Sequence, residues 1–339
     1  MRKIWIASLA ALGLAMFAGS AAAANLNAAG ATFPAPIYQK WFEEFKNSHP
    51  SIQVNYQAIG SGGGIRQLTV GTVDFGASDM PMTHEQLSQF SKFKVLHFPT
   101  VLGGVVPTYN IRGVTQGLKF TPDALAGIYL GEITKWNDGR IAKENPGVRL
   151  PNADITVVHR SDGSGTTFVW TDYLSKISSQ WKNKVGANTS VNWPVGLGSK
   201  GNDGVAGLVK QTPNSIGYVE LIYAVQQKMG YGSVRNSAGA FVKADLETVT
   251  AAAAGAASNI PADFRVSITD APGKNAYPIA TFTWMLIPSK IQDASKRNDI
   301  KTFLKWMLTT GQKDCAALSY APLPREVVAK ELKQIDEIQ

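Results

Sequence analysis

The sequence predicts an α/β protein of two domains. Three segments run from a strand through a turn to the start of a helix, at residues 28–45, 54–68 and 155–177. The chain has 339 residues, of which 44% are hydrophobic, so it is long for a single domain and can bury sizeable cores. We see no internal repeat and no linker long enough to separate independent modules.

The first 24 residues have the composition of a secretory signal peptide. Arg2 and Lys3 precede an apolar run at residues 4–17, and three alanines at 22–24 form an A-x-A cleavage site. We expect cleavage after Ala24 and export, most simply into a periplasm. The apolar run is short for a membrane span. Since Cys315 is the single cysteine, no internal disulfide forms, and we expect a buried free thiol.

Composition and spacing argue against several functional classes. The net charge of +8 includes Arg2 and Lys3, and the basic residues are scattered, so we expect no nucleic-acid partner. The four histidines show no metal-ligand spacing, so we expect no metal. Ser164 does not lie in a G-x-S-x-G motif, and the glycine-containing turns lack the lysine of a Walker A motif. The G-x-G-x-x-G match at 196–201 follows Trp193-Pro194 instead of a clear strand, so we interpret it as a loop.

The segment at 160–167, RSDGSGTT, is a candidate anion site. A β-branched run at 155–158 predicts a strand before it, and apolar residues at i, i+3, i+4 and i+7 from Trp170 predict a helix after it. The first N–H groups of a helix have no internal partner and attract anions. Ser164 and Thr166 add hydroxyl donors, and Arg160 adds a guanidinium fork. The alternative is an ordinary capped turn with a surface arginine.

Two earlier segments have the same organisation. Thr32 and Phe33 lie where a strand meets a helix start, and Ile37, Trp41 and Phe45 share one helix face. The strand at 54–59 ends in a turn where Ser61 is placed as an N-cap, followed by three glycines. Each glycine in a first helical turn costs about 1 kcal/mol relative to alanine, and such a conflict is typical of a functional site. A plain capped helix and a flexible loop are the respective alternatives.

The remaining elements connect these segments. A short strand ends at Asp79, which taken alone is a turn former before a proline. Two strand-like runs, 95–101 and 104–109, meet at Gly103-Gly104, where we place the first crossing between domains, and residues 277–288 form a strand that returns the chain. We expect helices at 122–130, 205–209, 251–257 and 300–308, and a strand at 215–219.

Several of these motifs together resemble a known family. They are GATFPAP at 30–36, IGS at 59–61, VDFGASD at 73–79 and RSDGSGT at 160–166, with GNDG at 201–204 and IGYVE at 216–220 in support. In this order they resemble the bacterial periplasmic phosphate-binding proteins, the substrate-capture components of a phosphate ABC transporter. The resemblance covers nearly all of the chain after the signal peptide. Gly62 departs from the family, which often has a second serine there.

The resemblance implies a fold and a site. The fold is the two-lobed periplasmic binding protein fold (type II), with a ligand cleft between lobes joined by two crossings. It implies lobe I at 25–103 and 280–339, and lobe II at 104–279. The implied phosphate ligands are Thr32, Phe33 through its N–H, Ser61, Asp79, Arg160, Ser164, Gly165 through its backbone, and Thr166, with Asp162 holding Arg160. Asp79 then becomes the one acceptor among donors.

The function that follows is phosphate binding for import. We expect no catalysis and no cofactor, and an inner-membrane ABC permease as partner. A receptor for another tetrahedral oxyanion, such as sulfate, is the alternative in the same class. A secreted phosphoester hydrolase with Ser164 or Thr166 as nucleophile is the alternative from another class.

Overall fold

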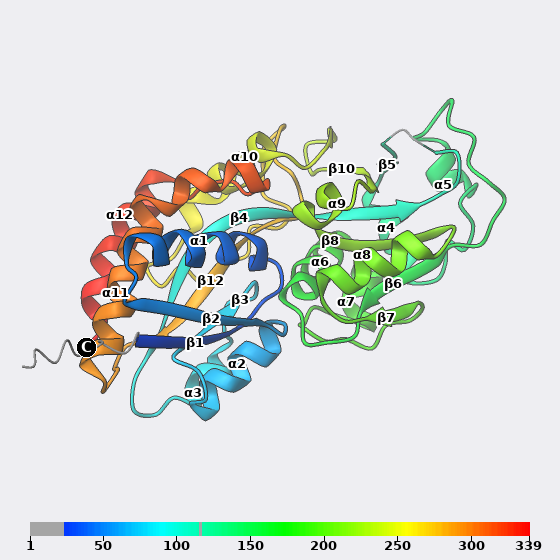
Figure 1. Ribbon diagram of the computed structural model, residues 1–339. Coiled ribbons are helices and arrows are strands. Elements are labelled where there is room, and N and C mark those ends of the chain that lie inside the picture. The colour runs from blue at the N-terminus through cyan, green and yellow to red at the C-terminus, as the bar shows by residue number, and fades with distance from the viewer. Residues whose placement is uncertain (1–23, 115–116) are drawn as a thin grey trace, which may run out of the picture.

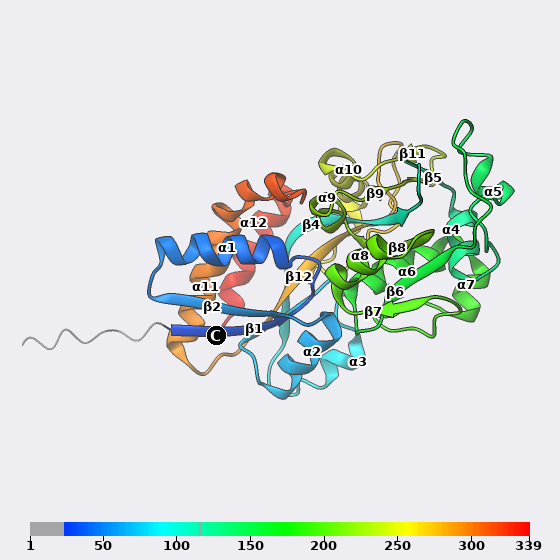
Figure 2. The ribbon, with the colours of Figure 1, turned by 45° about the vertical axis from the view of Figure 1, so that its right-hand side comes forward.

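The computed structural model describes residues 24–114 and 117–339, so the predicted signal peptide lies outside the described residues except for Ala24. Helices and strands form two groups side by side, joined by long strands that run between them (Figures 1 and 2). One sheet of nine strands extends through both groups in the order β2-β1-β3-β12-β4-β8-β6-β7, with β9 paired to β4. A small sheet has the order β11-β10-β5.

The first lobe contains both the start and the end of the described chain. Its strands are β1 (Ala24–Gly30), β2 (Ile52–Ala58), β3 (Phe75–Ser78) and β12 (Ala280–Pro288). Its helices are α1 (Ala35–Ser48), α2 (Ser61–Val70), α3 (His84–Ser88), α11 (Ala294–Thr309) and α12 (Arg325–Gln334), with short 3₁₀ turns at Gly311–Asp314, Ala316–Leu318 and Ile335–Glu337. β1 pairs in parallel with β2 and β3, whereas β12 is antiparallel to β3.

The second lobe contains the middle of the chain. Its strands are β5 (Lys119–Phe120), β6 (Thr156–Arg160), β7 (Leu197–Ser199), β8 (Ser215–Glu220), β9 (Gly230–Tyr231), β10 (Ser233–Arg235) and β11 (Phe241–Val242). Its helices are α4 (Pro122–Tyr129), α5 (Gly139–Ala142), α6 (Gly165–Ile177), α7 (Ser179–Lys184), α8 (Gly201–Gln211) and α9 (Leu221–Gln226). α10 (Leu246–Ala256), which continues into a 3₁₀ turn at Ala257–Asn259, follows them and packs on β4 and β12.

β4 (Val95–Asn110) passes from one lobe to the other as a single strand. Its first part pairs with β12 as far as Gly104, and its second part pairs with β8 from Val105 onward. The prediction of two runs meeting at Gly103-Gly104 was therefore wrong in placing a break there. A side chain on Gly103 would lie 2.6 Å from the Phe33 ring, so glycine at this position allows close packing instead. The change of partner coincides with the predicted first crossing, and the lobe boundaries themselves stay a prediction.

Local sequence explains the helices that carry the site. Pro34 precedes α1, whose predicted face of Ile37, Trp41 and Phe45 is fully buried. Ser164 caps α6, because its Oγ accepts a 3.0 Å hydrogen bond from the Thr167 N–H. The predicted face of α1 and the predicted helix after Ser164 are confirmed.

Two predictions about local structure need correction. Ser61 is not an N-cap: Gly60 precedes α2 with a φ of +89°, and Ser61 is the first helical residue. Its hydroxyl bonds to groups outside α2 instead of to its own helix. The segment at 196–201 is not only a loop, because Leu197–Ser199 forms β7, which is parallel to β6.

The C-terminal part of the chain packs as its pattern predicts. The apolar residues Ile300, Phe303, Leu304, Met307 and Leu308 of α11 are buried, and so is the thiol of Cys315. Within residues 24–114 and 117–339, no helix is both long and apolar enough to cross a membrane.

Candidate anion site

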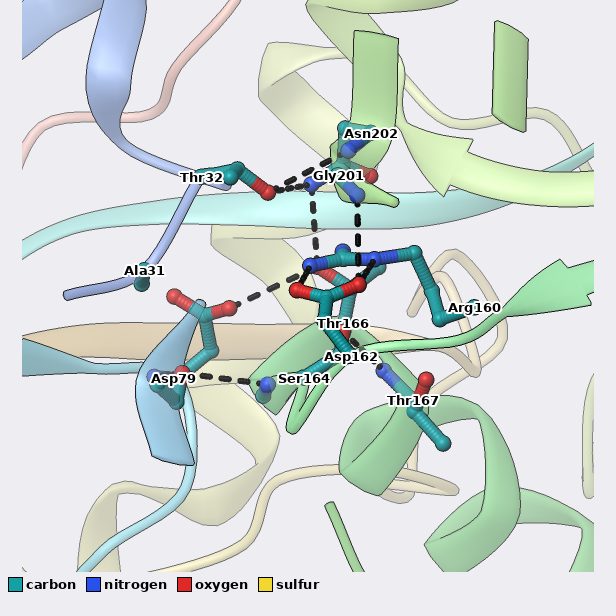
Figure 3. Close-up of polar contacts among 12 residues, drawn as sticks. Ala31, Thr32, Asp79, Arg160, Asp162, Ser164, Thr166, Thr167, Gly201 and Asn202 are labelled. Atoms are coloured by element: carbon teal, nitrogen blue, oxygen red, sulfur yellow. Dashed lines mark hydrogen bonds and ion pairs between the residues drawn. The ribbon is translucent and has the colours of Figure 1, made fainter. Parts of the chain in front are cut away.

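The structure brings the predicted ligand-binding residues together where the two lobes meet, and buries all of them. From the first lobe come Thr32 after β1 and Asp79 after β3 (Figure 3). Ser61 also comes from this lobe, at the start of α2. From the second lobe come Arg160 at the end of β6 and the first turn of α6. The side chains of Thr32, Phe33, Ser61, Asp79, Arg160, Ser164 and Thr166 are each at most 5% exposed, and Gly165 is also buried.

Arg160 is held by a carboxylate two residues away. Its Nε and Nη2 donate to the two oxygens of Asp162 at 2.7 and 2.6 Å. Burial alone would raise the pKa of Asp162, but hydrogen bonds from the Arg160 guanidinium hold it below its ordinary value. The Gly201 N–H also donates to Asp162, at 3.1 Å. Asp162, itself held by Gly201, thus fixes the orientation of the guanidinium.

The remaining nitrogen of that guanidinium is a free donor. Arg160 Nη1 is buried and has no hydrogen-bond partner in the part of the chain that the structure describes. A buried donor without a partner costs about 1–3 kcal/mol, and more when the group is charged. The sequence predicted that the Arg160 guanidinium binds an anion as a two-pronged fork. In the structure Asp162 occupies Nε and Nη2, so Nη1 is the nitrogen left without a partner among the described residues.

Ser61 joins the two lobes through its hydroxyl. Its Oγ accepts from the backbone N–H of Asp79 at 3.2 Å and from that of Gly165 at 3.0 Å. A hydroxyl has two lone pairs and one proton, so Ser61 can then only donate. The Gly165 N–H, predicted as a ligand contact, is engaged by Ser61 in this structure.

Asp79 is a carboxylate surrounded by donors. Its Oδ1 accepts from the Thr283 hydroxyl at 2.8 Å, and its Oδ2 accepts from the Thr166 hydroxyl at 3.4 Å. Burial raises the pKa of Asp79 to about 7, although the hydrogen bond from Thr283 and the charge of Arg160 oppose the rise. The carboxyl is therefore poised to hold or to share a proton near neutral pH.

Backbone and hydroxyl contacts fix the other predicted residues. Tyr218 OH lies 2.7 Å from the Thr167 hydroxyl and accepts from the Arg160 N–H at 3.1 Å, which ties β6 to α6. The Phe33 carbonyl accepts from Tyr320 OH at 2.6 Å, so the backbone here is anchored to the C-terminal part of the chain. The ligand role of the Phe33 N–H stays a prediction.

Sequence reasoning gave no role to two buried residues of this site. Asn202 lies between Thr32 and Thr166 and donates to both hydroxyls, and Thr283 holds Asp79. The GNDG motif at 201–204, which forms the start of α8, was the sequence signal that could have pointed to Asn202. Thr283 lies within an ordinary strand pattern that carries no such signal. Across residues 24–114 and 117–339, no three His, Cys, Asp or Glu side chains are grouped to hold a metal ion.

Comparison with known proteins identifies the family. The chain is 45% identical over 313 residues to the phosphate-binding protein PstS of Xylella fastidiosa, covering 92% of this chain and 84% of the relative. It is 44% identical over 325 residues to PstS of Pasteurella multocida, covering 96% and 93%. The chain belongs to this family of phosphate-binding proteins. A family model described as a PBP superfamily domain matches residues 17–310.

The chain also shares its fold with a solved phosphate-binding protein. The phosphate-binding protein of Stenotrophomonas maltophilia superposes with a TM-score of 0.68 at 21% identity, covering 92% of this chain and 94% of that one. At this identity the likeness concerns the fold alone. It confirms the predicted two-lobed α/β fold with a cleft between the lobes.

Proposed function

We propose that this protein binds inorganic phosphate between its lobes and delivers it to the membrane permease of an ABC transporter, without catalysing a reaction. The observation that carries the proposal is the pairing of Arg160. Asp162 holds its Nε and Nη2, while Nη1 is buried without a partner among the described residues. An anion oxygen is the partner that removes this cost, through a charge-assisted hydrogen bond.

The surrounding groups fit a tetrahedral anion that carries a proton. The Ser61 hydroxyl is left to donate, and the first turn of α6 supplies the hydroxyls of Ser164 and Thr166 at a positive helix end. Asp79 contacts one of these donors directly, because its Oδ2 accepts from the Thr166 hydroxyl. Phosphate carries at least one proton near neutral pH and can donate it to Asp79, whereas sulfate has none to donate.

The proposed ligand set is the one expected from the sequence. Thr32, Ser61, Ser164 and Thr166 donate through hydroxyls, Phe33 and Gly165 donate through backbone N–H groups, Arg160 donates through its guanidinium, and Asp79 accepts. The Gly165 N–H donates to Ser61 Oγ, so in this proposal it is shared between Ser61 and the anion. Asp162 supports the site through Arg160.

Two observations support a role in transport: the family to which the chain belongs and the predicted signal peptide at residues 1–24. The relatives are named as phosphate-binding proteins. The basic start, apolar run and alanine-rich end of residues 1–24 support export to a periplasm. We place lobe I at 25–103 and 280–339 and lobe II at 104–279, so that the two crossings frame the site.

A thermal-shift experiment tests the proposal against its alternatives. Ligand that binds only the folded state at a hundredfold excess over its dissociation constant stabilises it by about 2.7 kcal/mol. Phosphate at millimolar concentration should therefore raise the melting temperature of stripped protein. The same preparation should not hydrolyse p-nitrophenyl phosphate. Hydrolysis that Ser164→Ala abolishes would instead establish the phosphoesterase, and the absence of any phosphate shift would contradict phosphate binding.

A further inference from the structure

Two consecutive residues at the start of α8 contact both halves of the site. The Gly201 N–H donates to Asp162, which holds Arg160. The Asn202 side chain donates to Thr32 and to Thr166, which come from different lobes (Figure 3). Asn202 itself is fully buried. The inference below rests on the proposed phosphate function of the site.

The orientation of the Asn202 amide follows from its neighbours. Its Oδ1 lies 2.9 Å from the backbone N–H of Glu220, which can only donate, so the oxygen must face that group. Both hydrogens of Nδ2 are then available to Thr32 Oγ1 at 2.8 Å and to Thr166 Oγ1 at 3.1 Å. The Asn202 backbone N–H also donates to Thr32 Oγ1, at 3.3 Å.

These contacts decide what the threonine hydroxyls can do. Thr32 Oγ1 accepts two hydrogen bonds from Asn202, which uses both of its lone pairs and leaves only its proton. Thr166 Oγ1 accepts one from Asn202 and directs its proton toward Asp79 at the anion site. We propose that Asn202 is a positioning residue, which leaves Thr32 only its proton to donate to the anion and turns the proton of Thr166 toward Asp79.

The same contacts couple the lobes. Thr32 follows β1 in the first lobe, whereas Asn202 and Thr166 lie on α8 and α6 of the second. The bonds from Asn202 to Thr32 therefore exist only when the lobes are closed against each other. Closure and the donor orientation of Thr32 are thus one event, which Asn202 links to the bound anion.

The first test is Asn202→Asp, because the carboxylate keeps the size and the acceptor for Glu220 but loses both donors. An ionised Asp would accept the protons of Thr32 and Thr166, so phosphate affinity at pH 8 should fall by about 100-fold. Protonation of the new carboxyl at lower pH restores a donor. The affinity ratio of wild type to variant should therefore shrink as pH falls to 5, whereas a merely structural defect would give a constant ratio.

Taking the ratio removes the titrations that both proteins share. The charged or titratable groups around position 202 are Asp79, Arg160, Asp162, Asp203, Glu220 and Tyr223. The matched control is Asn145→Asp, since Asn145 is equally a buried amide bonded to backbone, at Lys119 and Ile141. It should leave phosphate affinity and its pH profile unchanged.

A double-mutant cycle keeps the proposal testable should the charged variant fail to fold. Asn202→Ala and Thr32→Val are measured alone and together by calorimetry with phosphate. If Asn202 acts through Thr32, Asn202→Ala should reduce affinity clearly in wild type and much less in Thr32→Val. Additive losses, or Asn202 variants with wild-type affinity, overturn this inference. Wild type that binds no phosphate would instead overturn the proposed function.

Discussion

Thr283 and Asp79 are joined by a 2.8 Å hydrogen bond from the threonine hydroxyl to Oδ1 of the carboxylate, across 204 residues of sequence. The bond ties β12 to the loop after β3 and fixes the plane of the carboxyl group. Its other oxygen, Oδ2, has only a long 3.4 Å contact with Thr166. Asp79 therefore has one firmly held oxygen and one weakly held oxygen, and we propose that the second accepts the ligand proton.

Replacing Asp79 with asparagine should relax discrimination between oxyanions. Asparagine supplies an N–H donor and removes the charge that repels a bare sulfate oxygen. We expect Asp79→Asn to keep phosphate affinity within about tenfold, because the other donors remain, and to gain measurable sulfate binding. Competition between sulfate and labelled phosphate measures both.

The matched control is Asp74→Asn in the same segment, since Asp74 pairs with Lys296 away from the anion site. It should bind sulfate no better than wild type does. A variant at position 79 that still excludes sulfate would show that another group selects the anion.

Asp79 should also make stability depend on pH. Its pKa is raised by burial from 3.8 to about 7, so the folded state binds this proton more tightly than the unfolded state does. The folded state then loses stability as pH rises from about 4 to about 7, by about 4 kcal/mol in total. Asp79→Asn removes this loss. Without phosphate, the variant should become increasingly more stable than wild type between pH 4 and 8 in denaturant unfolding.

Asp162→Asn is the control of opposite sign. Hydrogen bonds from Arg160 outweigh burial and hold the pKa of Asp162 below its ordinary value, so its ionised form stabilises the fold above that value and the gain is lost on acidification. This variant should be less stable than wild type at neutral pH. A parallel pH profile for the two variants would refute the assigned shifts.

Much of this organisation follows from local patterns, and the rest depends on long-range contacts. The periodicity from Trp170 onward predicted α6, because helix formation there is decided within a few residues. The hydroxyl of Ser61 was expected to cap its own helix, but it is taken by Asp79 and Gly165, 18 and 104 residues away. Gly103 and Gly104 were interpreted as the point where two strand-like runs meet, but they lie within the single strand β4, where Gly103 packs against Phe33 and Gly104 against Ala244 and Tyr277.

Residues that act on other site residues were the hardest to predict. Asn202 and Thr283 reach the site only through partners distant in sequence, at separations of 170 and 204 residues. Their own surroundings in the chain are an ordinary helix start and an ordinary strand. The GNDG motif could have pointed to Asn202, but nothing in the local sequence distinguishes Thr283 before the fold is known.

Removing Arg160 should cost more than removing any one hydroxyl. A charge-assisted hydrogen bond is about twice as strong as a neutral one, and Arg160→Ala also leaves Asp162 unpaired beside the anion. Calorimetry should show a larger loss of phosphate affinity for Arg160→Ala than for Thr166→Ala. Equal losses would mean that Arg160 does not contact the anion.

Arg140→Ala is the control for Arg160, because Arg140 forms the same kind of pair with Asp138 two residues away. That pair is partly exposed, at 47% for the arginine side chain. An exposed ion pair contributes about 0–1 kcal/mol to the stability of the fold. Arg140→Ala should therefore leave the fold, and with it the affinity for phosphate, unchanged.

Gly60 should be needed for closure of the lobes. A side chain there would lie 2.4 Å from Asp162 Oδ2 and 2.6 Å from the Gly163 carbonyl, and its φ of +89° is strained for other residues. Gly71, at the other end of α2, has a similar φ of +74° with no atom within 4 Å. Both alanine variants should lose similar stability without phosphate. Only Gly60→Ala should lose phosphate affinity, by tenfold or more, and equal affinities would refute a contact between lobes at this position.

Isothermal titration of stripped wild-type protein at pH 8 tests the central claim most directly. Phosphate and sulfate are titrated separately into the same preparation. We predict saturable binding of one phosphate per chain, and a sulfate affinity lower by about 10⁴ or more, since the site is built around a proton that sulfate lacks. Comparable binding of sulfate, or no binding of phosphate, would contradict the account.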